Sequence, residues 1–466
     1  MKSRARVAAI NDEDLMATMP RRNALADGAA ARRAMWLMLV LLLAALSAAC
    51  SKTKVPLPGE RVSILQLNTE LSADPALTDI AVRLPKPYVN TDWAQAGGSA
   101  SHAMYHLQAG GDVLTEVWSR DIGSSAGSSQ RLLAEPVVAD GLVYTLDAQS
   151  LVRAFEVETG QNVWQAVMTP EDEDDDLFGG GLGVAEGRIF ITTPYAEVYA
   201  LDAKTGAFIW RAAAPAPIRS APAISDGRVF VITIDNQLVA YAVDDGRRLW
   251  SNAGVEEAAG LLGGSTPAVL GNVVIAAYTS GELLAFDVVN GNSMWTESLA
   301  GRARTSAVAA LSDIRGRPVI DRDRVIAIGN GGVMAAIDLR RGERYWDRDL
   351  GGTQSPWAAG DFIYVMTSSS EVVCVTRDDG RIKWVRPLPP FEDMIEREDP
   401  VYWSGPVLVG DRLLVTGSNG LALSISPYTG EVLGKQDLPD RSHLPPVVAN
   451  EMVFMLSDDA ELIAFR

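Results

Sequence analysis

The sequence predicts an all-β fold, an eight-bladed β-propeller made of four-stranded antiparallel blades. Three observations support this prediction. A short motif ending in tryptophan returns every 38 to 51 residues, each unit contains four short apolar runs separated by turn residues, and the two ends of the array complete each other. A period of this length is typical of small sheets that bury their faces only by stacking on copies of themselves.

The repeated motif is clearest between Ala200 and Trp210, where it reads Ala-Leu-Asp-Ala-Lys-Thr-Gly-Ala-Phe-Ile-Trp. Its glycine suits the positive φ of a tight turn, so it marks the turn into the last strand of each unit. The aspartate is not kept in every copy. The motif recurs at Trp164, Trp210, Trp250, Trp295, Trp346 and Trp384, and a weaker copy has Gly434 in the same place.

Each unit is expected to hold four strands, as the unit ending at Trp250 illustrates. Its first strand follows Pro222, and Asp226-Gly227 then provides a hairpin turn. Two apolar runs come next, at residues 229–232 and 238–241, before the motif glycine turns the chain into the tryptophan strand. Four short strands in 40 to 50 residues favour a propeller blade over a helical or leucine-rich repeat.

The ends of the array predict how the ring closes. The last unit, residues 444–466, stops after its third strand, and an isolated tryptophan strand, residues 113–118, lies before the first complete unit. We therefore expect Trp118 to complete the final blade, which removes an open sheet edge. An unclosed solenoid is the alternative. The expected third strands are centred on Ala154, Ala200, Ala240, Ala285, Ala336, Cys374, Ser424 and Ala464, which makes eight blades.

The net charge limits the choice of partners. The formal charge is −18 at pH 7, and residues 1–49, with seven Lys or Arg against four Asp or Glu, contribute +3, so the rest carries −21. Such an acidic surface repels nucleic acid and anionic lipid. We expect no nucleic-acid partner.

The N-terminus predicts the compartment. A 13-residue apolar run, residues 34–46, follows Arg32-Arg33 and is too short to span a bilayer. Small residues directly before Cys50 resemble a lipoprotein signal, although Ser47 stands where leucine is usual. We expect a signal peptide at 1–49, a lipidated Cys50 with a Pro-rich tether and irregular chain at 50–112, where Trp93 packs onto the ring, and a propeller at 113–466. An ordinary secretory signal is the alternative.

A search for catalytic or metal-binding residues finds little. His102 and His106 are four residues apart but lack the intervening glutamate of zinc proteases, so we expect no metal site. The acidic run 171–176 lacks the ligand spacing of a calcium loop, and residues 391–399 form an expected inserted loop. The second cysteine, Cys374, occupies a small-residue position of a third strand, which predicts a buried core thiol.

The repeated motif resembles the tryptophan-docking motif of propellers related to pyrroloquinoline-quinone (PQQ) dehydrogenases. This resemblance implies that each motif tryptophan, together with Trp118, packs between blades. That role is structural, so the repeat alone implies no cofactor. Methanol-dehydrogenase-like members carry an adjacent cysteine pair at the quinone, which this chain lacks. We expect no cofactor and no enzymatic activity.

Together with the lipoprotein signal and the tether, the repeats resemble the BamB family of outer-membrane assembly lipoproteins. The resemblance implies a non-enzymatic scaffold on the periplasmic side of the outer membrane. Its expected partners are the POTRA domains of a BamA-like barrel protein and other lipoproteins of the assembly machinery, with unfolded outer-membrane proteins as a further partner. A PQQ-dependent periplasmic dehydrogenase and a general binding propeller of the envelope are the alternatives.

The resemblance also implies a contact loop. One family loop carries Leu-Arg-Gly-x-Ser-Ala-Pro, and residues 218–222, Ile-Arg-Ser-Ala-Pro, match part of it. Arg219 and Ile218 are therefore the expected partner-binding residues. A second family loop places an acidic pair before Thr-Thr-Pro, but residues 262–267 of this chain contain no acid.

Overall fold

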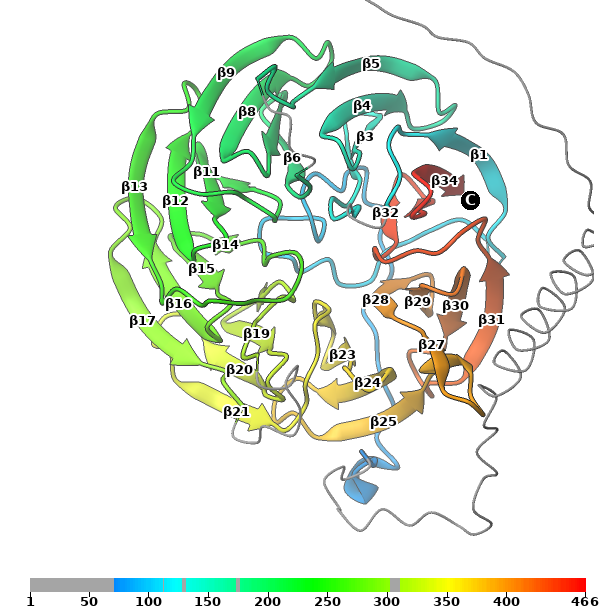
Figure 1. Cartoon of the computed structure of the whole chain (residues 1–466). Coiled ribbons are helices and arrows are strands. Elements are labelled where there is room, and N and C mark those ends of the chain that lie inside the picture. Colours follow the sequence, from blue (N-terminus) through cyan, green and yellow to red (C-terminus); the bar gives the residue numbers. More distant parts are fainter. Residues whose placement is uncertain (1–70, 112, 128–130, 173–176, 302–310) are drawn as a thin grey trace, which may run out of the picture. The chain divides into compact units, whose positions relative to one another are not determined.

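The architecture is a ring of eight four-stranded antiparallel sheets, which confirms the predicted fold class (Figure 1). The computed structural model describes residues 71–111, 113–127, 131–172, 177–301 and 311–466. They belong to one compact unit, Thr69–Arg466, and the only described helix is a single 3-10 turn, η1 (Pro75–Leu77). The signal peptide and Cys50 lie outside the described residues.

The blades follow one another in chain order around the ring. Blades 1 to 4 are β2–β5 (Val137–Ala139, Leu142–Leu146, Leu151–Glu156, Asn162–Val167), β6–β9 (Gly181–Ala185, Arg188–Thr192, Glu197–Asp202, Phe208–Ala213), β10–β13 (Ala223–Ser225, Arg228–Ile232, Gln237–Ala242, Arg248–Ala253) and β14–β17 (Ala268–Leu270, Val273–Ala277, Glu282–Asp287, Ser293–Ser298). Blades 5 to 7 are β18–β21 (Val319–Asp321, Arg324–Ile328, Met334–Asp338, Arg344–Arg348), β22–β25 (Trp357–Ala359, Phe362–Met366, Glu371–Thr376, Ile382–Pro387) and β28–β31 (Trp403–Val409, Arg412–Gly417, Leu421–Ile425, Val432–Asp437).

Blade 8 joins the two ends of the array, as predicted. It combines β32 (Val447–Ala449), β33 (Met452–Leu456) and β34 (Glu461–Phe465) with β1 (Glu116–Asp121) as its outermost strand. Trp118 pairs with Ala464 in the antiparallel register of β1 and β34. The ring therefore has no open sheet edge between its first and last blades.

Every blade repeats one pairing between its third and fourth strands. The small third-strand residue lies opposite the motif tryptophan, as in the pair Ala200 and Trp210, and the register shifts next to that pair. The same pairing occurs at all eight predicted centres, with Gly434 opposite Ser424 in blade 7. The third-strand residue at this position is alanine in six blades, cysteine in blade 6 and serine in blade 7.

Each motif tryptophan joins its blade to the next one. Nε1 of Trp210 donates a hydrogen bond to the carbonyl oxygen of Val243, at 2.8 Å, in the following blade. The indole lies against Gly246, where an added Cβ would be only 2.5 Å from the ring. Equivalent Nε1 donations, between 2.8 and 3.1 Å, come from Trp118, Trp164, Trp210, Trp250, Trp295, Trp346 and Trp384. The docking role expected for these seven residues matches their positions.

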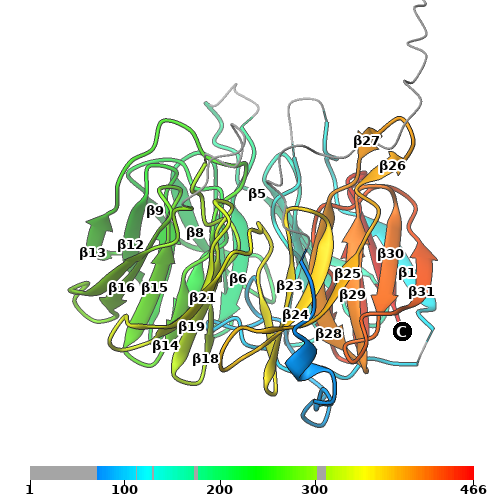
Figure 2. The same ribbon diagram turned by 90° about the horizontal axis from the view of Figure 1, so that it is seen from below.

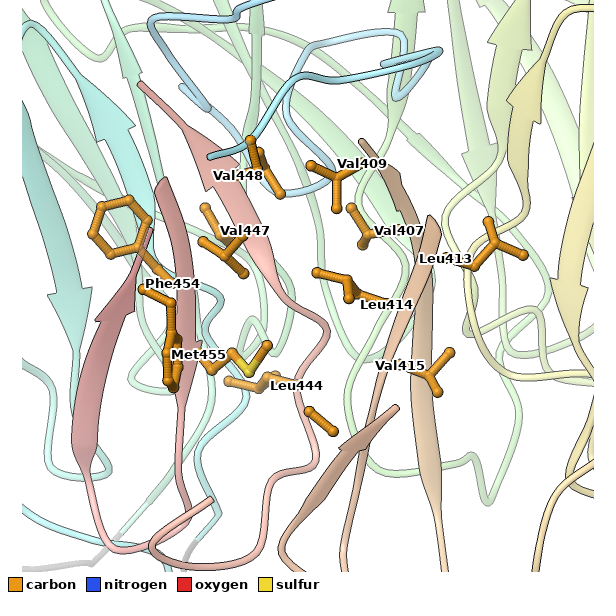
Figure 3. Packing of buried hydrophobic residues seen from close by; sticks show 14 of the residues in the cluster. Val407, Val409, Leu413, Leu414, Val415, Leu444, Val447, Val448, Phe454 and Met455 are labelled. Carbon is orange, nitrogen blue, oxygen red and sulfur yellow. The ribbon is translucent and has the colours of Figure 1, made fainter. Parts of the chain in front are cut away.

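The interface between blades 7 and 8 is built differently. Blade 8 has no turn between its third and fourth strands, because β34 ends the chain and β1 enters from elsewhere in the sequence. No glycine turn is there to receive an indole, and blade 7 carries Gly434 at that place. Aliphatic side chains fill the interior of these two blades instead (Figure 3), including Val407, Leu414, Leu444, Val447 and Met455.

An irregular segment, residues 90–110, crosses one face of the ring (Figure 2), and we call it the axial segment. Trp93 is buried and stacks on Trp357 with ring centroids 6.3 Å apart, as expected for packing onto the ring. The segment hydrogen-bonds to the innermost strand of every blade. The bonded pairs are Trp93–Val138, Ala94–Val184, Gln95–Ile224, Ala100–Val269, Ser101–Ile320, Tyr105–Trp357, Leu107–Leu408 and Asn90–Val448.

Two local features differ from the sequence prediction. The segment 391–399 forms a β-hairpin, β26 (Phe391–Asp393) and β27 (Glu398–Pro400), where a loop was expected. The first strand of blade 7 does not follow its proline but contains it, because β28 begins at Trp403 and the register shifts around Gly405-Pro406. Neither difference alters the number or the order of the blades.

We predict that Trp210→Ala lowers the free energy of unfolding by about 3–5 kcal/mol, because it empties a buried aromatic site between two blades and removes a hydrogen bond. Urea unfolding measures this change. The matched control is Phe208→Ala on the same strand, whose side chain is 64 % exposed. Equal effects of the two substitutions would contradict the docking role of the indole.

Candidate partner-binding site

The face opposite the axial segment carries the candidate site. We call it the loop face, and it is formed by the connections from the outermost strand of one blade to the innermost strand of the next. The β26–β27 hairpin stands on this face (Figure 2). Its described connections include residues 214–222, 254–267, 311–318 and 388–402.

Arg219 lies on the connection between β9 and β10, on the loop face. The backbone N–H of Ile218 donates to the Thr193 carbonyl oxygen at 3.2 Å, and Thr192 Oγ1 donates to the Ser220 carbonyl oxygen at 2.6 Å. These bonds hold the chain on both sides of Arg219. The Arg219 guanidinium is partly exposed, lies 5.9 Å from the Phe178 ring centre, and forms no ion pair with a described residue.

The neighbouring candidate, Ile218, is placed differently from Arg219. Its side chain is fully buried among the core residues of blades 2 and 3. A buried side chain does not reach a partner. Ile218 therefore anchors the loop that carries Arg219. The prediction for Arg219 remains open, because no partner is present.

The centre of the loop face is lined by arginines. A cavity of about 70 Å³ on the ring axis is bordered by Arg219, Arg315, Arg317 and Glu135, and its base includes Ala96 of the axial segment. Nη1 of Arg317 and Oε1 of Glu135 form an ion pair at 2.6 Å. Three cations and one anion give this lining a formal charge of +2, in a chain whose formal charge is −18.

Sequence analysis did not single out Arg315 or Arg317. Both lie in the connection before β18. Their proximity to Arg219 depends on the folding of the ring, since Arg219 comes from a different connection, between β9 and β10. The only local signal is the pair of arginines that flanks Gly316.

The two neighbouring histidines, His102 and His106, lie in the axial segment and hydrogen-bond to backbone carbonyl oxygens. Nδ1 of His102 lies 2.7 Å from the Pro318 carbonyl oxygen, and Nδ1 of His106 lies 2.8 Å from the Pro85 carbonyl oxygen. Burial, and secondarily the charge of Arg317, lowers the pKa of His102 from 6.5 to about 3. Among the described residues, no three His, Cys, Asp or Glu side chains form a group that could hold a metal ion.

Two other expectations concern the remaining cysteine and the acidic run. Cys374 is fully buried opposite Trp384, which confirms the predicted core thiol, and burial raises its pKa. Most of the acidic run 171–176 lies outside the described residues. In the described part of the chain, no helix is long and apolar enough to cross a bilayer.

A closed ring of eight blades joined by docked tryptophans defines the chain as a β-propeller of tryptophan-docking repeats. The chain belongs to the family described as outer membrane protein assembly factor BamB, whose model matches residues 148–386 and 396–466. The BamB of Escherichia coli K12 is 28% identical over 352 residues, which cover 74% of this chain and 87% of the relative. The BamB of Yersinia pestis is 25% identical over 359 residues, covering 75% and 88%.

Solved structures share the fold at lower identity. The crystal structure of BamB from Moraxella catarrhalis superposes with a TM-score of 0.64 at 19% identity, covering 76% of this chain and all of that one. A europium-containing methanol dehydrogenase superposes with a TM-score of 0.65 at 14% identity, covering 80% of this chain and 98% of that one. Similarity at these identities describes the fold alone.

We predict that His102 makes stability dependent on pH. Its pKa is lower in the folded chain than in the unfolded chain, so the unfolded chain binds the proton more tightly and stability is lost as pH falls below 6.5. The loss from this residue between pH 8 and pH 5 is about 2 kcal/mol. His102→Asn keeps a donor for the Pro318 carbonyl but does not titrate. Urea unfolding at both pH values should show a smaller loss in the variant, and equal losses would contradict the assignment.

Proposed function

We propose that this chain is a non-enzymatic scaffold lipoprotein of the outer-membrane β-barrel assembly machinery. In this proposal the loop face around Arg219 binds the POTRA region of a BamA-like protein and assists the insertion of β-barrel proteins. The observation that carries the proposal is the state of Arg219, which lies on a loop like the family's contact loop, is fixed by buried Ile218, and has no ion-pair partner among the described residues.

The geometry of the ring supports a scaffold. Tryptophan docking and the axial segment fix each blade relative to its neighbours, so the loop face presents its groups at constant spacing. A guanidinium offers a planar set of donors to a carboxylate or a carbonyl oxygen. The outermost strand of each blade has a free edge, along which an extended strand of a partner or of an unfolded barrel protein could pair.

The membrane attachment is proposed to come from lipid on Cys50. The mature chain carries a formal charge of −21, so electrostatic attraction to anionic lipid does not hold it at a membrane. Acyl chains on the N-terminal cysteine provide that attachment instead, because each buried methylene adds to the affinity. The tether after Cys50 then leaves the propeller in the periplasm, beside other lipoproteins of the machinery.

The quinone-dependent dehydrogenase is the weaker candidate. The axial cavity has a volume of about 70 Å³, whereas small-molecule sites are typically about 300–1,000 Å³. Trp93 and the rest of the axial segment occupy the other face of the ring centre. A tricyclic quinone therefore does not fit the residues around the axis, and the sequence contains no adjacent cysteine pair.

We predict that Arg219→Glu reduces copurification of a BamA-like protein from crosslinked envelopes by about tenfold, because it reverses the charge at the proposed contact. Mass spectrometry of the crosslinked pull-down measures the change. The matched control is Arg247→Glu in the turn between β12 and β13, with a side chain that is 68 % exposed. Unchanged copurification would remove Arg219 from the contact, and a wild-type pull-down without a BamA-like protein would favour a general envelope propeller.

We also predict that Cys50→Ala releases the protein from the membrane fraction into the periplasmic extract, because the lipid attachment site is lost. Labelling with a radioactive fatty acid and fractionation test this together. Cys374→Ala is the control, since alanine stands at that position in most blades and the thiol is buried. Labelled Cys50→Ala protein, or unlabelled wild type, would exclude lipidation at this cysteine.

A further inference from the structure

We propose that a cleft beside the ring axis binds an acidic and apolar peptide segment of the partner, with its carboxylate held by Arg315. This inference rests on the proposed function and adds a second contact to that of Arg219. It assigns the loop face a defined ligand chemistry, a carboxylate next to an apolar side chain. The argument comes from the state of Arg315, the lining of the cleft, and the acids that surround them.

Arg315 has no direct ion pair among the described residues, although the charges of Asp313 and Glu135 act on it from a distance. It forms no hydrogen bond or ion pair with a described residue, whereas its neighbour Arg317 is paired with Glu135 at 2.6 Å. The acid nearest in sequence, Asp313, is buried and accepts a hydrogen bond from the Leu261 backbone N–H at 2.7 Å. Burial lowers the pKa of Arg315, and the charges of Asp313 and Glu135 offset only part of this effect. An external anion would provide that compensation.

The loop in front of Arg315 leaves room for such an anion. Gly263 and Gly264 occupy this loop and line the axial cavity. An added Cβ at Gly263 would lie 3.1 Å from Nε of Arg315, so a larger residue would crowd the guanidinium. The absence of a side chain at Gly263 therefore leaves space beside the guanidinium for a ligand.

The cleft next to Arg315 is large and mostly apolar. Its volume is about 570 Å³, and Arg315 lies on the wall that it shares with the axial cavity. Asp458 also lines the cleft, and its Oδ2 lies 2.7 Å from Nδ1 of His443. The apolar lining includes Leu133, Leu261, Leu262, Met366, Tyr402 and Trp403.

This lining favours a peptide over other anionic ligands. A planar guanidinium binds a carboxylate through two parallel hydrogen bonds, and the apolar walls bury an adjacent side chain. A cleft of this size holds a few side chains. The acidic surface of the rest of the chain disfavours nucleic acid and anionic lipid, which carry many charges, whereas a single carboxylate needs only local compensation.

The test uses the purified mature protein and a defined probe, the peptide acetyl-Phe-Asp-Leu-amide, with acetyl-Phe-Asn-Leu-amide as its uncharged match. We expect isothermal titration calorimetry at low salt to show at least tenfold tighter binding of the aspartate peptide. Arg315→Gln should abolish this difference, and Arg315→Lys should keep part of it. The exposed-turn control, Arg247→Gln, should behave as wild type. Equal affinities for both peptides in the wild type would overturn the proposal.

Two further measurements keep the result interpretable. Leu262→Ser changes a cleft residue that is 40 % exposed, so it leaves the fold intact and should weaken both peptides equally. Free succinate should bind at least tenfold more weakly than the aspartate peptide. The peptide cleft would be refuted if succinate bound as tightly as the aspartate peptide. It would also be refuted if the affinity for the aspartate peptide were the same in wild type, Arg315→Gln and Leu262→Ser.

The crosslinked pull-down separates this inference from the proposed function. If wild type retains a BamA-like protein, Arg315→Gln should reduce that retention about tenfold. Unchanged retention together with no preference between the peptides overturns the cleft alone. A wild-type pull-down that lacks a BamA-like protein overturns the proposed function, while a preference for the aspartate peptide would still support the cleft.

Discussion

The contact between each motif tryptophan and the glycine of the next blade is the constraint on which the whole ring depends. The glycine adopts a positive φ and has no Cβ, so the indole approaches its backbone directly. The indole N–H is satisfied by a carbonyl of the same turn region, as between Trp210 and Val243. One residue pair thereby fixes both the separation and the rotation of two blades. Seven such pairs restrict the relative positions of the blades around the ring.

The exception to this pattern follows from the way the ring closes. A blade shared by both ends of the array has no third turn, so the preceding blade gains nothing from a tryptophan, and Gly434 stands there. Closure is strengthened elsewhere. Arg466 forms an ion pair with Glu158 of blade 1 at 2.9 Å, and the axial segment bonds to the innermost strand of every blade. A segment that contacts all blades stabilises the one interface without an indole.

The sequence was sufficient for the fold because the repeated features are local. The small residue, the glycine and the tryptophan recur at fixed spacing, so eight third strands and the shared blade could be predicted. The path of the axial segment could not, since Gln95 and Ile224 meet only after the ring has formed. The same holds for Arg315, which joins Arg219 from another blade. The sequence also could not show that Ile218 is buried while Arg219 is partly exposed. In a strand the alternation of side chains predicts burial, but these two residues lie in a connection between strands.

The two faces of the ring have different roles. The axial segment satisfies the backbone groups of the inner strands on one face and buries Trp93, so little polar backbone remains there for a partner. On the loop face, Arg219 and Arg315 lack direct ion pairs among the described residues, although acids outnumber bases in the chain by 18. A partly buried cation without a direct ion pair is less stable than one whose charge is compensated. Their position on one face is the basis for the proposal that an acidic partner binds there.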